Sequence, residues 1–322
     1  MRVVQSSSAN PLVSIIVVTY NSSKFVVETL ESVKAQTYQN IELIVSDDCS
    51  MDDTVDICRE WLDKNAERFC QTELVSAKIN GGIGTNCNRG LRIAKGEWIK
   101  FFAGDDILLK GSIQGYLDHI KIHDEIEVLH GRVQQFKDEF TSDNKIKSVS
   151  RNKVKFNMKS TTPAEQFQIL LRNNAVQAPS VFIKKSVFEK VGGFHEEFKM
   201  WEDRPMWLKI TQNNIKMHYL DKICAKYRIH ANSVQLKKKE YEVYPRFVLE
   251  RDKHLITNYG CYLPPIERYL KTMNLRRKVI IEKLYAKIPL KGIKAIISLI
   301  DTVFDYSISR IDRKYSIVKN SK

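Results

Sequence analysis

The stretch Trp98-Ile-Lys-Phe-Phe-Ala-Gly-Asp-Asp106 decides the fold that we predict for this chain. Residues 99–102 are mostly apolar and partly aromatic, which predicts a short buried strand. Ala103-Gly104 then allows a tight turn, because glycine lacks a Cβ atom. Asp105 and Asp106 follow directly. Adjacent anions repel, so the pair needs water or a cation, and oxygen ligands in an open loop suit Mg²⁺ or Mn²⁺. A solvated acidic turn is the simpler alternative.

The preceding sequence alternates strands and helices at short spacing. Apolar runs at 12–19 and 41–46 and a third at 71–77 predict strands, and the segments 22–36, 54–65 and 85–94 predict helices. This β-α-β-α-β-α-β order predicts an α/β fold with a mostly parallel sheet, helices on both faces and a Rossmann-like nucleotide-binding half. Ser22 or Ser23 is the expected cap of the first helix, and Ser50 with Asp53 of the second.

Polar clusters follow three of these strands: Thr19-Tyr20-Asn21, Asp47-Asp48 and Asp105-Asp106. Ligands of such sheets bind at the carboxyl ends of the strands, so we expect the clusters to converge on one site. Asp47 can accept a hydrogen bond from a base N–H, and Tyr20 can stack on the base. The glycine-rich fingerprint of NAD-binding proteins is absent after the first strand, where the turn reads Thr-Tyr-Asn-Ser-Ser.

The second half of the chain is less regular. Strands are predicted at 127–133, 179–183, 216–220 and 224–228, and helices from Thr161, at 185–191 and from Glu202-Asp203 to about 213. Residues 140–160 are polar and basic and predict a loop. Residues 236–322 are mainly helical in pattern, and 291–311 form an amphipathic helix that either packs on the protein or lies on a membrane surface.

Charge is spread unevenly along the 322 residues. The formal net charge is +14, of which residues 236–322 carry +11 and the remainder +3. A basic tail favours an anionic partner, either a membrane or a nucleic acid. The tail lacks aromatic interleaving and any recognised nucleic-acid motif, so we expect no nucleic-acid partner.

Cysteine spacing and hydropathy bear on the compartment. The six cysteines form no C-x-x-C pair, which favours a reduced cytosolic chain without a structural zinc site. The first ten residues lack an apolar leader, and no apolar run approaches the ~18 residues of a membrane-spanning helix. We therefore expect a cytoplasmic protein.

Ordered motifs along residues 11–235 carry a family resemblance. They are Val13-Ser-Ile-Ile-Val-Val-Thr-Tyr-Asn21, Ser32-Val-x-x-Gln36-Thr37, Ile44-Val-Ser-Asp47-Asp48-x-Ser50-x-Asp52, Asn80-x-Gly82, Asn88-x-Gly90, Gly96-Glu-Trp-Ile-x-Phe-Phe-x-x-Asp105-Asp106, Gly192-Gly193-Phe194, Glu202-Asp203 and Tyr227-Arg228-x-His230-x-x-Ser233. With these motifs the chain resembles the family 2 glycosyltransferases of the GT-A fold. The resemblance implies a catalytic domain over residues 1–235 and leaves 236–322 as a basic, mainly helical C-terminal extension.

The resemblance implies an inverting, metal-dependent transfer from a nucleotide-sugar, most often UDP-linked, by an enzyme of the hexosyl- or N-acetylhexosaminyltransferase type. The implied product is a bacterial surface polysaccharide such as a capsule or O-antigen. The acceptor is a glycan or is lipid-linked, and is met at the inner face of the membrane through peripheral contact by residues 236–322. The implied roles are these: Thr19, Tyr20, Asn21 and Asp47 line the nucleobase pocket; Asp105 and Asp106 bind ribose and Mn²⁺ or Mg²⁺; Asp203 is the general base, supported by Glu202; Arg228 and His230 touch the diphosphate or metal.

Several residues have simpler explanations. Many family members carry Asp-x-Asp-Asp where this chain has Ala103-Gly104-Asp105-Asp106, so a non-catalytic GT-A-like module that binds a nucleotide or a partner is the alternative. Asp203, which precedes Arg204-Pro205, also fits a helix cap. Asp48 fits a residue that supports its turn. Cys49 stands where the family often has glycine.

Overall fold

The computed structural model describes residues 10–146, 154–231, 233, 244, 246–285 and 297, in two compact units. One unit comprises Met1–Phe167 and Ala175–Ile229, and the other comprises Gln168–Asn174 and His230–Lys322. The domain boundary that the sequence predicts at 235/236 lies outside the described residues. Each unit is described separately below.

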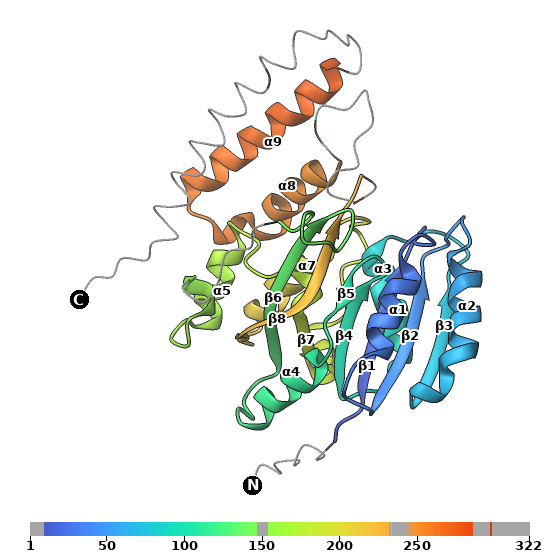
Figure 1. The fold of residues 1–322 in the computed structure, drawn as a ribbon. Helices are drawn as coiled ribbons and strands as arrows, with labels where there is room; N and C mark the ends of the chain where they lie inside the picture. The colour runs from blue at the N-terminus through green and yellow to red at the C-terminus, as the bar shows by residue number, and fades with distance from the viewer. Residues whose placement is uncertain are drawn as a thin grey trace. The chain divides into compact units, whose positions relative to one another are not determined.

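The first unit is built on a sheet whose described strands follow the order β3-β2-β1-β4-β7-β6-β8-β5 (Figure 1). Their bounds are β1 Val13–Thr19, β2 Ile41–Asp47, β3 Gln71–Ser76, β4 Trp98–Ala103, β5 Ile107–Leu108, β6 Val128–Lys137, β7 Val181–Lys184 and β8 Met217–Ile229. The neighbours β3, β2, β1 and β4 are all parallel, as are β6 and β8, whereas β7 is antiparallel to β4 and β6, and β5 to β8. The predicted mostly parallel sheet is confirmed.

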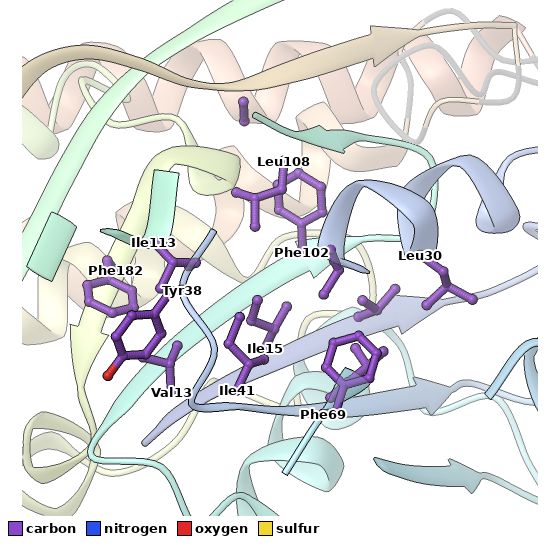
Figure 2. Packing of buried hydrophobic residues seen from close by; sticks show 14 of the residues in the cluster. Val13, Ile15, Leu30, Tyr38, Ile41, Phe69, Phe102, Leu108, Ile113 and Phe182 are labelled. Atoms are coloured by element: carbon purple, nitrogen blue, oxygen red, sulfur yellow. The ribbon is translucent and has the colours of Figure 1, made fainter. Parts of the chain in front are cut away.

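Helices cover both faces of this sheet, as predicted. They are α1 Val26–Lys34, α2 Thr54–Asn65, α3 Ile83–Ile93, α4 Ser112–Lys121, α5 Pro163–Leu170, α6 Lys185–Val191 and α7 Asp203–Gln212, with 3₁₀ turns at Ala66–Arg68, Lys155–Asn157 and Ala178–Ser180. Val13 and Ile15 of β1 belong to a buried cluster with Leu30 of α1 (Figure 2). Ile16 points the other way, toward α3, where a Cβ on Gly90 would lie 2.4 Å from its Cγ2. Successive strand residues thus serve opposite layers.

Local details differ from the sequence-based expectations. The two strands predicted at 216–220 and 224–228 are one strand, β8, whose pairing with β6 shifts register near Arg132. Helix α4 was not predicted. The predicted serine cap of α1 is wrong: the helix begins at Val26, and the Ser22 carbonyl accepts the N–H groups of Phe25 and Val26.

The predicted Ser50–Asp53 cap of α2 is also wrong, although the helix has the predicted bounds. Ser50 Oγ donates to Asp47 instead. Asp52 Oδ1 accepts a hydrogen bond from the backbone N–H of Thr54 at 3.1 Å, and so binds an N–H group at the start of α2. An aspartate near the start of α2 was expected correctly, but it is Asp52 rather than Asp53.

The second unit is helical where it is described. It contains α8 Arg246–Tyr259, a 3₁₀ turn at Gly260–Tyr262 and α9 Pro265–Tyr285, and α8 packs on α9. Helix 291–311 of the sequence prediction lies outside the described residues, except for Ile297, which is helical and buried. None of the described helices combines the length and the apolar character needed to span a bilayer.

Candidate functional site at the strand ends

The parallel register brings the three predicted polar clusters to one edge of the sheet. Thr19 at the end of β1 pairs with Asp47 at the end of β2, and Val18 pairs with Ala103 at the end of β4. The Gly104 N–H then donates to the Val18 carbonyl at 3.0 Å. The loops after β1, β2 and β4 therefore adjoin one another.

Gly104 is required where these loops meet. A Cβ on Gly104 would lie 2.8 Å from Thr19 Cγ2 and 3.3 Å from Ser22 Cβ. Such contacts are too short for any side chain, so only glycine lets the acidic turn approach the end of β1 this closely. The glycine thus sets how near Asp105 and Asp106 come to the first loop.

Asp106 is the most constrained residue of the acidic turn. Its carboxylate is fully buried, and Oδ1 accepts the backbone N–H of Arg228 at 2.9 Å. Oδ2 is buried and has no hydrogen-bond partner. Burial, and then the charge of Asp105, raise the pKa of Asp106 well above its usual range. A buried carboxylate oxygen without a donor is chemically suited to a cation.

Two adjacent carboxylates fit a divalent metal only if other oxygens complete the coordination. Within the described residues, no three His, Cys, Asp or Glu side chains are grouped to hold a metal ion. Mg²⁺ is commonly held by one or two carboxylates together with substrate phosphates and water. Asp105 and Asp106 match that pattern, so the donor set fits a metal that arrives with a diphosphate.

Arg228 holds this acidic turn in place. Its side chain is buried, and Nε donates to the Asp105 carbonyl at 2.9 Å, while the other nitrogens reach Glu28 and the Asp138 carbonyl. The guanidinium also stacks over Phe25 and Phe140, with its Cζ 4.4 and 4.0 Å from the ring centroids. Arg228 thus positions the acidic turn, and the contact with diphosphate or metal that the resemblance implies stays a prediction.

The Asp47-Asp48 loop is saturated by protein donors. Asp47 accepts hydrogen bonds from Thr19 Oγ1, from the backbone and hydroxyl of Ser50, and from Ser76 Oγ, at 2.5–3.3 Å. Its carboxylate is fully buried. Asp47 therefore fixes the wall of the predicted nucleobase pocket, and its contact with a base stays a prediction.

Asp48 supports its turn, as the simpler reading expected. Its oxygens accept the N–H groups of Gly81 and Gly82 at 3.0 and 2.7 Å, and Arg89 at 3.3 Å. Gly82 has φ +90°, and a Cβ there would lie 2.5 Å from Lys199 Cα. The turn between β3 and α3 is thereby locked to the loop after β2.

Tyr20 and Asn21 form the open side of the first loop. Asn21 adopts φ +50°, its N–H donates to Ser50 Oγ, and its Oδ1 accepts the Met51 N–H, both at 2.8 Å. Tyr20 remains 44% exposed. An exposed aromatic ring beside a rigid loop suits stacking on a planar base.

Glu202 and Asp203 lie at the start of α7. Asp203 Oδ1 accepts the N–H of the next residue, Arg204, at 2.6 Å, whereas the N-cap residue of α7, Glu202, makes no side-chain capping bond. Loss of solvent, followed by the charge of Asp203, raises the pKa of Glu202 to about 8. Glu202 is therefore a weaker acid than an ordinary glutamic acid side chain.

The segment before this pair is anchored on α3. Asn88 Oδ1 accepts the Phe194 N–H at 2.8 Å, and its Nδ2 donates to the Phe194 carbonyl and to Glu196. The Ile83 N–H donates to the Lys199 carbonyl at 3.1 Å. These bonds tie the approach to Glu202 to the turn that Asp48 holds.

Tyr227 belongs to the Tyr227-Arg228-x-His230-x-x-Ser233 motif, and the sequence predicts no role for it. Burial raises its pKa, and the charges of Asp106, Asp105, Asp203 and Glu202 raise it further, in that order. Both acidic pairs thus lie within electrostatic reach of one phenol. The sequence signal that could have indicated Tyr227 is its place near the end of β8, two residues before Ile229. His230 directly follows this strand, and its N–H donates to Ser233 Oγ at 3.0 Å.

Comparison with known proteins identifies the family. Residues 14–192 match the model of glycosyl transferase family 2. The chain belongs to this family. It is 29% identical over 227 residues to the UDP-Glc:alpha-D-GlcNAc-diphosphoundecaprenol beta-1,3-glucosyltransferase WfaP of Escherichia coli, covering 70% of this chain and 81% of WfaP. An uncharacterized glycosyltransferase of Rickettsia prowazekii is 28% identical over 239 residues, with 72% and 70% coverage.

Solved structures agree on the GT-A fold of this glycosyltransferase. TarS of S. aureus, residues 1–349 in complex with UDP-GlcNAc, superposes with a TM-score of 0.58 at 21% identity, over 83% of this chain and 72% of that chain. A mannosyltransferase of Pyrobaculum calidifontis in complex with GDP-Man and Mn²⁺ gives 0.54 at 17% identity, over 96% and 84%. The predicted fold is confirmed.

Proposed function

We propose that this family 2 glycosyltransferase moves a sugar from a UDP-sugar to a hydroxyl of a glycan or lipid-linked acceptor, with inversion and with help from Mn²⁺ or Mg²⁺. The reaction serves bacterial surface polysaccharide synthesis, such as a capsule or O-antigen, and takes place in the cytoplasm at the inner face of the membrane. The donor and acceptor named for WfaP support this choice. The transferred group is a hexosyl or N-acetylhexosaminyl residue.

One observation carries the proposal: the buried Oδ2 of Asp106 lacks a donor. When bound, the metal supplies Lewis-acid stabilisation of charge on the leaving diphosphate. Asp105 and Asp106 would hold it, and Asp105 also reaches the ribose. Arg228 keeps both carboxylates in position through the Asp105 carbonyl and the Asp106 carboxylate.

The nucleotide is held by the loops after β1 and β2. Tyr20 stacks on the base, and Thr19, Asn21 and Asp47 give the pocket its shape through the bonds between the two loops. We also predict that His230 contacts the diphosphate or the metal. Binding energy from these contacts orients the anomeric carbon for attack.

Asp203 is the proposed general base. Asp203 accepts the acceptor's proton, and it lies beside Glu202, whose pKa is raised to about 8 by burial and by the charge of Asp203. Glu202 orients the acceptor through a hydrogen bond. Inversion follows from in-line attack on the face opposite the diphosphate.

A donor screen tests this function. The purified chain with Mn²⁺ is incubated with UDP-, GDP- and dTDP-sugars, and the released nucleoside diphosphate is measured, with thermal stabilisation recorded in parallel. We expect one UDP-sugar to be hydrolysed slowly and chelation to stop the reaction. Asp203→Asn should bind the donor as before and lose turnover. Binding without turnover in the unaltered chain, with every acceptor offered, would support the binding module instead.

A further inference from the structure

Helix α9 of the second unit buries polar side chains and exposes several apolar ones, although its Leu270, Leu275 and Ile281 are half-buried. It buries three polar side chains, Glu267, Asn274 and Lys278. It exposes an apolar stripe consisting of Ile266 (59% exposed), Tyr269 (63%), Met273 (38%) and Ile280 (56%). A surface helix ordinarily turns its apolar residues inward. The stripe therefore faces water in a place where apolar cover is expected.

The inward face of α9 is fixed by paired charges. Glu267 accepts Arg172 Nη2 at 2.7 Å, with both side chains nearly fully buried. Lys278 donates to Asp252 of α8 at 2.9 Å. Breaking a buried pair leaves an uncompensated charge, which is strongly destabilising. The helix therefore cannot roll to bury its stripe, and the exposure is a stable property of the unit.

The exposed side of α9 is basic as well as apolar. The stripe residues are three, four and seven positions apart, so they lie on one side of the helix. Arg268, Arg276 and Lys283 are exposed with them. Both carboxylates of α9 are engaged elsewhere: Glu267 with Arg172, and Glu282 with the backbone N–H of Tyr244. Over residues 265–283, no exposed residue is acidic.

We propose that this side of α9 docks on the surface of an anionic lipid bilayer. The stripe enters the boundary between headgroups and acyl chains, Tyr269 lies at the interface, and Arg276 and Lys283 meet lipid phosphates. A second copy of the chain suits the stripe less, because paired stripes would bring Arg276 and Lys283 of two chains together with no exposed carboxylate to neutralise them. The inference rests on the proposed function in one respect: a lipid-linked acceptor lies at such a surface.

Flotation with vesicles tests the docking. The full chain is mixed with phosphatidylcholine vesicles that contain either no or 40% phosphatidylglycerol, without donor or acceptor. We expect binding to the anionic vesicles only. The variant Ile266→Ser/Met273→Ser/Ile280→Ser should lower partition at least tenfold, and Arg276→Glu/Lys283→Glu should do the same, since each basic residue near such a surface contributes about fivefold.

Controls separate this inference from the proposed function. Ile122→Ser removes an equally apolar residue, 73% exposed at the end of α4, and should leave partition unchanged. Donor hydrolysis in vesicle-free buffer should be the same in all variants. Equal hydrolysis shows that the variants are folded, and it measures catalysis separately from membrane docking. Equal partition of the triple variant and the unaltered chain would overturn the proposal, because another segment would then bind the lipid. Conversion of a dimer to a monomer by the triple variant, with unchanged partition, would assign the stripe to a second copy.

Discussion

Asp47-Asp48 follows β2 and Asp105-Asp106 follows β4, and both pairs lie at the same edge of the sheet. The first pair accepts hydrogen bonds from serine and threonine hydroxyls, two glycine N–H groups and Arg89. In the second pair, Asp106 has one backbone donor on Oδ1 and none on Oδ2. Asp47 and Asp48 therefore have a protein donor on every carboxylate oxygen, whereas Asp106 keeps one buried oxygen without a donor.

The difference shows what makes an acidic loop a ligand site. The loop after β2 brings its own donors, so its charge is neutralised within the protein and the loop becomes rigid. The loop after β4 is buried by its neighbours without receiving enough donors, so it gains most from a cation. Asp47, Asp48 and Asp106 are all buried, and the supply of donors separates Asp106 from the other two.

The largest expected effect is that of Asp106→Asn on catalysis. Turnover should fall by about 10²–10³, because the substitution removes a charge that would hold the metal, and each 1.36 kcal/mol is a factor of ten. The free energy of unfolding without metal should change by less than about 1 kcal/mol, since the Asn amide oxygen still accepts the Arg228 N–H. Turnover is measured as nucleoside diphosphate released over time, and the free energy of unfolding is measured by urea titration. A large loss of stability would place Asp106 with the structural pair and break the comparison.

Gly82→Ala should be the most damaging change in the turn between β3 and α3, which donates to Asp48. The residue has φ +90°, and the new Cβ would meet the Lys199 backbone at 2.5 Å. We expect a loss of about 2–4 kcal/mol in urea denaturation. Gly111→Ala is the matched control, because φ is +76° there but the nearest atom lies at 3.8 Å. It should cost only about 1 kcal/mol, from backbone strain alone.

Asp48→Asn tests the saturated pair directly. The amide can replace only one of the two acceptor oxygens, so a donor from Gly81, Gly82 or Arg89 loses its partner. Stability should fall by about 1–3 kcal/mol. Asp63→Asn, on the exposed side of α2, should change it by less than about 0.5 kcal/mol. Equal effects of Asp48→Asn and Asp106→Asn on stability would contradict the contrast between the pairs.

The smallest expected effect is a gain from Cys49→Gly. Cys49 has φ +66° in the loop after β2, a conformation that glycine adopts without strain. Relief of strain exceeds the added entropy of the unfolded chain, so stability should rise by about 0.5–1 kcal/mol. Cys261→Gly, in a 3₁₀ turn, should lower stability instead. We expect the melting temperature to rise for Cys49→Gly and to fall for Cys261→Gly.

Local sequence patterns predicted the elements well where the pattern itself decides the structure. The apolar runs of β1, β2 and β4 and the periodicity of α2 needed no distant partner. Helix α4 was missed because it begins after Gly111, which has φ +76°, with no side-chain cap to announce it. The single strand β8 was split in two because Asp221 and Lys222 interrupt its apolar pattern.

The candidate site was predicted as a place rather than as a set of contacts. Parallel topology alone brings the three strand ends together, so Asp105 and Asp106 could be chosen from sequence. Asp47 receives donors from Thr19 and Ser76, 28 and 29 positions away, as well as from nearby Ser50, whereas the donor to Asp106 is Arg228, 122 positions away. The distant donors appear in no local pattern, and contact of Arg228 with the diphosphate or metal and of Asp47 with the base stay predictions.

Arg228 has a consequence for how this enzyme can change. One side chain joins Glu28 and Phe25 near the start of α1, the excursion at Asp138 and Phe140, and the acidic turn. Substitutions at these positions share a partner, so their effects on stability should not add. Substitutions in the segment around Asp138 and Phe140, made in a search for new donor sugars, would therefore disturb Asp105 and Asp106. Phe25, Glu28, Asp138 and Phe140 would have to be randomised together. In a library, they form a single unit of selection.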